Sequence, residues 1–192
     1  MKKHDIINGF IQKHNYKSYL EIGVKKGKTF RGVRCKRKVG VDIAAYPDAT
    51  YVMESDTFFE RNDRKYDLIF IDGLHRYKQV LKDIQNSLSV LNKNGTIVCH
   101  DMLPATKEMQ EVPREGRKEW VGNCWKAWVN LRQSGDDLEM FVIDTDYGCG
   151  IIQRGKQKKL QIDKSITYEN LDKNREKWLN LISVEEFKKN YL

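Results

Sequence analysis

The strongest secondary-structure signal in the chain is YDLIFIDG, residues 66–73. A continuous apolar run bounded by turn-forming residues is typical of a strand buried on both faces of a sheet. Apolar side chains recur at helical spacing over residues 75–91, and a second apolar run, TIVCHD, occupies residues 96–101. A strand, a helix and a strand in this order indicate an α/β fold whose parallel sheet is covered by helices.

The same alternation continues on both sides of this segment. Upstream, the patterns predict a helix over 4–15, strands over 18–23, 37–43 and 50–54, and a basic helix ending near Cys35. Asn94-Gly95 is expected to end the helix of residues 75–91, because glycine adopts positive φ readily. Downstream, the patterns predict a long polar loop over 102–121, a helix from Trp125, and an antiparallel strand pair over 140–146 and 148–154. Ser183-x-x-Glu186 has the form of a capping box and predicts a short final helix.

Length and composition are those of one ordinary folded domain. The chain has 192 residues, and it lacks an apolar run near the ~18 residues that span a bilayer. The first residues carry charge without a long apolar stretch behind them, so we expect no signal peptide and a cytoplasmic protein. The four cysteines are far apart and lack metal-ligand spacing, which predicts reduced, buried thiols.

Positive charge is concentrated at the start of the chain. Lys+Arg 35 and Asp+Glu 27 give a net charge of +8. Residues 1–40 hold 12 basic and 2 acidic side chains, a net of +10, so the remaining 152 residues sum to −2. This basic region is either a footprint for phosphate groups or a solvated surface, and a charge run alone favours the second interpretation.

Acidic residues and glycines stand where strands of the predicted sheet end. Glu21, Gly23 and Gly27 end the first strand, and Asp42 ends the second about twenty residues later. Glycine lets the backbone come close to a ligand, and an acidic group at this spacing commonly binds ribose hydroxyls. Neither the dinucleotide pattern G-x-G-x-x-G nor the P-loop is present. The spacing therefore favours a nucleoside-containing ligand with a cationic end.

Taken together, these segments resemble the class I S-adenosylmethionine-dependent methyltransferases. YLEIGVKKGKTF is similar to the first motif of that family and VGVDI to its second, and FIDGLHRYKQVLKDI followed by LNKNGTIVCHD resembles a small group with F-I-D-G-x-H after strand four. The likeness covers roughly residues 17–154. It implies a Rossmann-like three-layer sandwich with a mostly parallel seven-stranded sheet and an antiparallel last strand. We therefore expect a methyltransferase domain over 1–154 and a helical extension of the same domain over 155–192.

The resemblance also implies roles for individual residues. Those expected to bind S-adenosylmethionine are Glu21, Gly23 and Gly27 at the methionine part, Asp42 at the ribose, Ser55 and Asp56 at the adenine edge, and Asp72 at the junction with the acceptor. Each acidic residue also has a structural alternative. Glu21 can be a surface residue, Asp42 a helix cap and Asp56 an N-cap.

The acceptor's proton must be removed during methyl transfer, and the candidates lie at the ends of two neighbouring strands. Asp72, His75 and His100 are the candidate catalytic residues, with either histidine as general base. Asp72, His100 and Asp101 are the candidate ligands of a divalent cation, for which magnesium is the first expectation. His75 can also be a simple helix-start residue.

These expectations give one leading function and two rivals. The leading function is O-methylation of a sugar or another small hydroxylated acceptor. The first rival is a nucleic-acid methyltransferase that uses the basic first 40 residues, although no Asp/Asn-Pro-Pro-Tyr/Phe element is present. The second is a non-catalytic accessory protein of the same fold.

Overall fold

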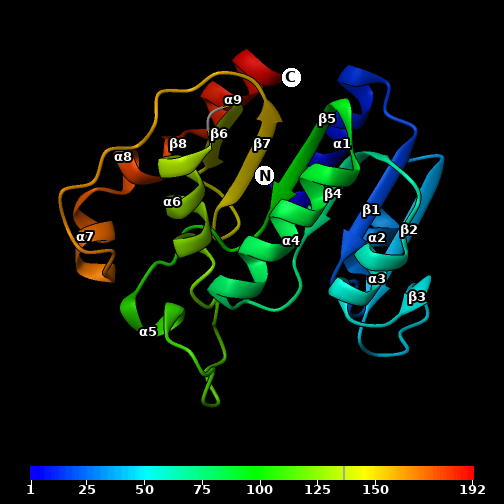
Figure 1. Cartoon of the computed structure of the whole chain (residues 1–192), viewed down its shortest axis with the longest axis horizontal. Helices are drawn as coiled ribbons and strands as arrows, with labels where there is room; N and C mark the ends of the chain where they lie inside the picture. Colours follow the sequence, from blue (N-terminus) through cyan, green and yellow to red (C-terminus); the bar gives the residue numbers. More distant parts are fainter. Residues whose placement is uncertain (136) are drawn as a thin grey trace.

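The computed structural model describes residues 1–135 and 137–192 and has one sheet with helices on both faces (Figure 1). The described strands are β1 (Ser18–Ile22), β2 (Arg37–Asp42), β3 (Tyr51–Val52), β4 (Tyr66–Ile71), β5 (Leu91–Cys99), β6 (Leu138–Ile143), β7 (Cys149–Arg154) and β8 (Leu181–Ile182). The described helices are α1 (Lys3–His14), α2 (Lys28–Gly32), α3 (Ser55–Arg61), α4 (Tyr77–Val90), α5 (Lys107–Gln110), α6 (Trp125–Ser134), α7 (Tyr168–Lys173), α8 (Arg175–Leu179) and α9 (Val184–Tyr191). The predicted α/β class is confirmed.

The strand order has a switch point between β1 and β4. The sheet has the order β3-β2-β1-β4-β5-β7-β6-β8. The strands from β3 to β5 are parallel, whereas β7 runs antiparallel to both β5 and β6. The predicted Rossmann-like sheet and its antiparallel pair are thus confirmed. The order reverses between β1 and β4, and open sheets bind ligands beyond the carboxyl ends of strands at such a point.

The sheet has one strand more than the seven expected. The additional strand, β8, is two residues long and pairs in parallel with β6 through Val142↔Leu181 and Ile143↔Ile182. It lies inside the segment 155–192, which we expected to be helical, and it follows α8 directly. The C-terminal segment is therefore hydrogen-bonded into the same sheet as the strands before it.

Alternate residues of β4 face two different helical layers. Leu68 and Phe70 pack in a cluster with side chains of α1, α2 and α9, and Ile69 and Ile71 pack in a cluster with side chains of α4, α6 and α8. All four side chains are almost fully buried. Burial on both faces explains why this strand has a continuous apolar run instead of alternation.

The helix of residues 75–91 ends without the expected glycine cap. The structure ends α4 at Val90, and Leu91 is already extended. Gly95 lies inside β5, where a Cβ atom would stand 2.7 Å from the carbonyl oxygen of Asp67. Glycine is needed here because β4 and β5 approach closely, and not because a helix stops.

The two ends of the described chain agree with the predicted helices. The opening helix is α1, and α9 begins after Ser183, whose Oγ accepts a hydrogen bond from the Glu186 amide at 3.0 Å. Phe187 of α9 is fully buried and its ring lies 5.6 Å from that of Phe10. Among the described helices, none combines the length and apolar character needed to cross a membrane.

Candidate functional site

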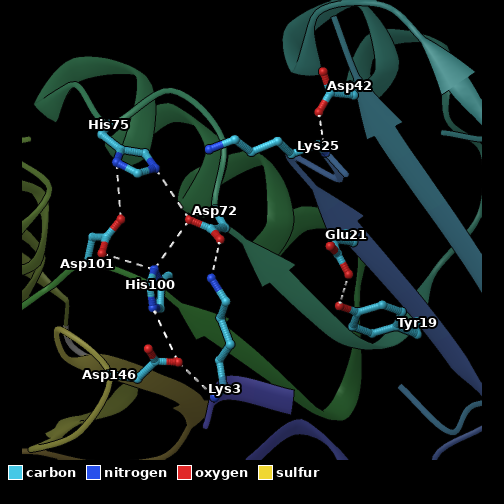
Figure 2. A network of polar contacts seen from close by, with 10 residues as sticks. All are labelled: Lys3, Tyr19, Glu21, Lys25, Asp42, Asp72, His75, His100, Asp101 and Asp146. Carbon is cyan, nitrogen blue, oxygen red and sulfur yellow. Dashed lines mark hydrogen bonds and ion pairs between the residues drawn. The ribbon is translucent and has the colours of Figure 1, made fainter. Parts of the chain in front are cut away.

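Four titratable side chains meet at the carboxyl ends of β4 and β5 (Figure 2). Asp72 Oδ1 lies 3.3 Å from His75 Nε2 and 3.4 Å from His100 Nδ1. Asp101 lies 3.1 Å from His75 Nδ1 through Oδ2 and 3.0 Å from His100 Nδ1 through Oδ1. The structure therefore brings together all the residues that the sequence nominated for catalysis or metal binding.

Two further residues, Lys3 and Asp146, complete the network. Lys3 Nζ lies 2.7 Å from Asp72 Oδ2, and its backbone amide donates to Asp146 Oδ2 at 3.1 Å. Asp146 Oδ2 also lies 3.8 Å from His100 Nε2. Sequence reasoning missed both residues. Asp146 follows a strand end and so carried a signal, whereas only the packing of α1 brings Lys3 to a carboxylate 69 positions away.

The network fixes the charge of its central groups. Burial alone would raise the pKa of Asp72, but His100, His75 and Lys3 outweigh it and hold this pKa well below its usual range. Burial would likewise lower the pKa of His100, but the carboxylates of Asp101, Asp146 and Asp72 hold it well above its usual range. The His100 ring nitrogens make no well-aligned hydrogen bond within the described chain, so this attraction is ionic. The carboxylates around His100 therefore favour its protonated form.

The backbone is left-handed at Asp101, Asp146 and Tyr147, which are not glycines. Asp101 has φ 63°, Asp146 has φ 49° and Tyr147 has φ 59°. Such conformations cost on the order of 1 kcal/mol each in residues other than glycine and persist where the surroundings hold them. Here they turn the carboxylates of Asp101 and Asp146 toward the histidines.

Three of these side chains can share one cation. Asp72, His75 and Asp101 each offer one ligand atom, and these atoms all lie within 4.8 Å of one another. Two carboxylate oxygens and one imidazole nitrogen suit a divalent ion such as Mg²⁺ or Mn²⁺. The histidine of this set is His75, whereas the sequence nominated His100. The assignment of His100 as a ligand therefore stays a prediction.

The loop after β1 is fastened to the neighbouring strands. Gly23 has φ +90°, and a Cβ atom there would collide with the carbonyl oxygen of Asp72. Asp42 accepts hydrogen bonds from the backbone amides of Lys25 at 2.8 Å and Ala44 at 3.0 Å. Each carboxylate oxygen has a second lone pair, so Asp42 can still receive ribose hydroxyls. Gly23 is thus required first by the close approach of two strand ends.

Glu21 is buried in the layer between the sheet and α1. Its side chain accepts a hydrogen bond from the hydroxyl of Tyr19 and is only 1% exposed, which excludes the surface alternative (Figure 2). Burial raises its pKa to about 8, although the bond from Tyr19 lowers it. Glu21 is therefore mostly neutral at pH 7 and is poised to ionise when a cation comes near.

Ser55 and Asp56 begin α3 and face α4. Ser55 Oγ donates to Asp83 Oδ1 at 2.7 Å, and Asp56 pairs with Lys82 at 2.6 Å. The N-cap of α3 is Glu54, so Asp56 does not serve as the cap. Burial raises the pKa of Asp83 to about 6. Asp83 lies at a buried position of α4, and the sequence analysis did not single out its carboxyl group.

The predicted loop of residues 102–121 contains α5 and folds back onto His75. The rings of Trp120 and His75 stack at 5.2 Å with an interplanar angle of 12°. A Cβ atom at Gly122 would collide with the His75 carbonyl, and Asn123 Oδ1 accepts a hydrogen bond from the Tyr77 amide at 2.6 Å. This segment therefore covers one side of the site.

Residues 42–102 match the family model of a methyltransferase domain. The matched range begins at Asp42 and contains Asp72, His75, His100 and Asp101. It spans about a third of the chain. No curated protein sequence matches this chain.

Solved methyltransferase structures share the fold. An O-methyltransferase from Bacillus cereus in complex with S-adenosylhomocysteine is 14% identical, with 78% of this chain and 79% of that chain covered and a TM-score of 0.56. The tomaymycin-synthesis O-methyltransferase from Streptomyces achromogenes in complex with S-adenosylmethionine is 11% identical, with 80% and 79% covered and a TM-score of 0.57. The N-methyltransferase NodS from Bradyrhizobium japonicum is 15% identical, with 81% and 95% covered and a TM-score of 0.51. These identities establish a common fold.

Proposed function

We propose that the chain is an S-adenosylmethionine-dependent methyltransferase that methylates a hydroxyl oxygen of a small acceptor such as a sugar. The observation that carries the proposal is the cluster of Asp72, His75 and Asp101, which lies beside the β1–β4 switch point of a methyltransferase fold. A group that can hold a cation or take a proton is what a hydroxyl acceptor needs at that place.

Glu21, Gly23 and Asp42 are proposed to bind the methyl donor. S-adenosylmethionine carries its methyl group on a cationic sulfur. The acceptor oxygen attacks this methyl group in line, and the sulfur leaves as a neutral thioether. Glu21 supplies a carboxylate to the donor's ammonium group, and Asp42 accepts hydrogen bonds from the ribose. Ser55 and Asp56 stand at the adenine edge. The rigid loop after β1 holds the donor so that the acceptor need only be aligned with it.

His75 is proposed as the group that handles the acceptor's proton. Of the two histidines, His100 is only 7% exposed in its side chain, so an acceptor can reach it less easily. His75 is 20% exposed in its side chain and lies between Asp72 and Asp101, which orient its ring. Alternatively, a divalent cation held by Asp72, His75 and Asp101 would lower the pKa of the acceptor hydroxyl.

Calorimetry tests the donor site directly. We expect S-adenosylmethionine and S-adenosylhomocysteine to bind and NAD not to bind, with and without Mg²⁺. If neither sulfur compound produces heat, the proposed function is wrong. His4→Ala, on the outer part of α1, is the control that leaves donor binding unchanged.

Turnover on a panel of acceptors tests the rest. Sugars, catechols and primary amines are incubated with donor, and His75→Asn is compared with wild type before and after treatment with a chelator. We expect methyl transfer to hydroxyl oxygen, and a loss of kcat in His75→Asn with little change in donor affinity. Transfer to amines alone would overturn the oxygen assignment. If turnover by the wild type is unchanged after treatment with the chelator, proton removal is assigned to His75 itself.

A further inference from the structure

A second concave surface lies at the opposite edge of the sheet. This groove has a volume of about 990 Å³ and is lined by the last turns of α1, by Lys17 and by residues of the segment 34–37. Lys17 directly precedes β1, and Arg37 is the first residue of β2. The groove therefore lies at the amino ends of these strands, where the arrows in Figure 1 begin, whereas Asp72 and Asp101 follow the carboxyl ends of β4 and β5.

Four of the nine described residues that line the groove are cationic. Lys17, Arg34, Lys36 and Arg37 line it, and the described lining contains no carboxylate. Across the described residues, the side chains of Arg34, Lys36 and Arg37 make no ion pair or hydrogen bond. The basic region therefore leaves three unneutralised cations on one concave surface.

Other cations of the same region have partners within the protein. Arg31 pairs with Asp48, and Lys38 Nζ donates to the carbonyl oxygens of Phe30 at 2.7 Å and Val33 at 3.2 Å. The three unneutralised groove cations thus differ from these two neighbours in lacking a side-chain partner among the described residues.

The backbone that carries these cations is held in place from two sides. Asn8 of α1 donates to the Gly32 carbonyl at 2.9 Å and accepts from the Arg34 amide at 2.8 Å. On the other side, the Arg37 amide donates to the Lys17 carbonyl at 3.1 Å. The cations are therefore presented from a fixed scaffold, which reduces the entropy lost when a ligand binds.

We propose that this groove binds a ligand that carries several phosphate groups. Two of its cations are arginines, whose planar forks match phosphate oxygens in pairs. Three of the cations follow one another along the segment 34–37 and the fourth precedes β1, so a row of phosphates can contact more of them than one compact anion can. The ligand is either a free polyphosphate or a stretch of single-stranded RNA.

This inference does not rest on the proposed function. The groove and the Asp72 cluster lie at opposite edges of the sheet, so a ligand in the groove does not present its own atoms to the cluster. The groove is a second site. It binds its ligand through the ligand's phosphate groups, and these groups do not take part in methyl transfer.

Binding of two phosphate probes tests the proposal on the full chain. Inorganic tripolyphosphate is titrated by calorimetry, and a fluorescein-labelled single-stranded RNA decamer by anisotropy over a series of salt concentrations. With four cations engaged, the logarithm of RNA affinity should fall against the logarithm of salt with a slope of about −3. A slope near zero for RNA, together with no heat from tripolyphosphate, would overturn the proposal.

The variant Arg34→Gln/Lys36→Gln/Arg37→Gln removes three of the four cations and keeps side chains of similar length. We expect it to weaken binding of the probe by at least about tenfold and to reduce the RNA salt slope to about −1. If this variant melts below the wild type, the single variant Arg34→Gln replaces it, with an expected loss of about twofold to fivefold.

The matched control is Lys173→Gln/Lys188→Gln/Lys189→Gln, which removes the same charge from exposed positions elsewhere. We expect it to retain wild-type affinity within about twofold, since none of these three lysines lines the groove. An equal loss in both triple variants would mean that net charge alone attracts the probe, and the groove would be rejected. Binding of RNA only, or of tripolyphosphate only, supports the groove and identifies the source of its phosphates.

Discussion

Glu21 provides a quantitative test of the donor site. Burial holds its pKa at about 8, so the carboxyl is protonated in most molecules at pH 7. If the ammonium group of the donor binds beside it, the carboxylate form becomes favoured and the proton is released. Binding of S-adenosylmethionine should therefore release a proton from the protein.

The pKa sets the size of this effect. With a pKa of about 8 before binding and an ordinary value after it, about 0.9 protons leave at pH 7 and about 0.1 at pH 9. Since Glu21 must ionise before it pairs, the dissociation constant should fall about ninefold between pH 6 and pH 7 and level off above pH 8.

Calorimetry in buffers with different ionisation enthalpies measures the released proton. The slope of apparent binding enthalpy against buffer ionisation enthalpy gives the number of protons exchanged. S-adenosylhomocysteine keeps the ammonium group and lacks the sulfonium charge, so it should release the same number. If S-adenosylmethionine releases a proton and S-adenosylhomocysteine does not, the release is caused by the sulfonium charge.

Glu21→Gln is the matched variant because glutamine can still accept the hydrogen bond from Tyr19. We expect proton release to disappear in this variant and the pH dependence of binding to flatten. Tight binding by wild type at pH 7 with no proton exchanged would refute the placement of Glu21 at the donor's ammonium. The same proton count in both proteins would refute it as well.

Three further predictions concern other parts of the structure. Gly23→Ala should destabilise the fold by at least about 1 kcal/mol, seen as a lower melting temperature, because its Cβ would meet the neighbouring strand end; unchanged melting would contradict the observed approach. Asp101→Asn should weaken Mn²⁺ binding by at least about tenfold, measured by electron paramagnetic resonance, whereas Asp56→Asn should not. Equal effects of these two variants would rule out the cation cluster. Ser183→Ala should cost about 1 kcal/mol in denaturant unfolding through the loss of a helix cap; no change would mean that solvent replaces the cap fully.

Local patterns predicted the central sheet well and its edges less well. Residues 66–71 form β4 because an apolar run of that length is buried on both faces, whatever its neighbours are. The strand β8 could not be predicted in the same way. A two-residue strand is too short to show a periodic pattern, and Leu181 and Ile182 pair with β6 because α8 brings them to its free edge. The predicted end of α4 at Asn94-Gly95 was wrong because glycine is favoured both at a helix cap and where two strands approach closely.

The candidate site was predictable where a residue follows a strand directly. Asp72, His100 and Asp101 were nominated on that basis, and parallel strands place such residues at one edge. Lys3 could not be nominated, because its position depends on how α1 packs across the sheet. The histidine of the cation cluster depends on ring orientation and protonation. Neither property can be read from sequence spacing.

The groove and the Asp72 cluster present different kinds of charge at opposite edges of the sheet. The groove has unpaired cations and no carboxylate among its described lining residues, whereas Asp72, Asp101 and Asp146 gather in the cluster. A diffusing cation and a diffusing polyanion would therefore be steered toward different ends before either makes contact. Added salt should slow both encounters without changing which end each prefers.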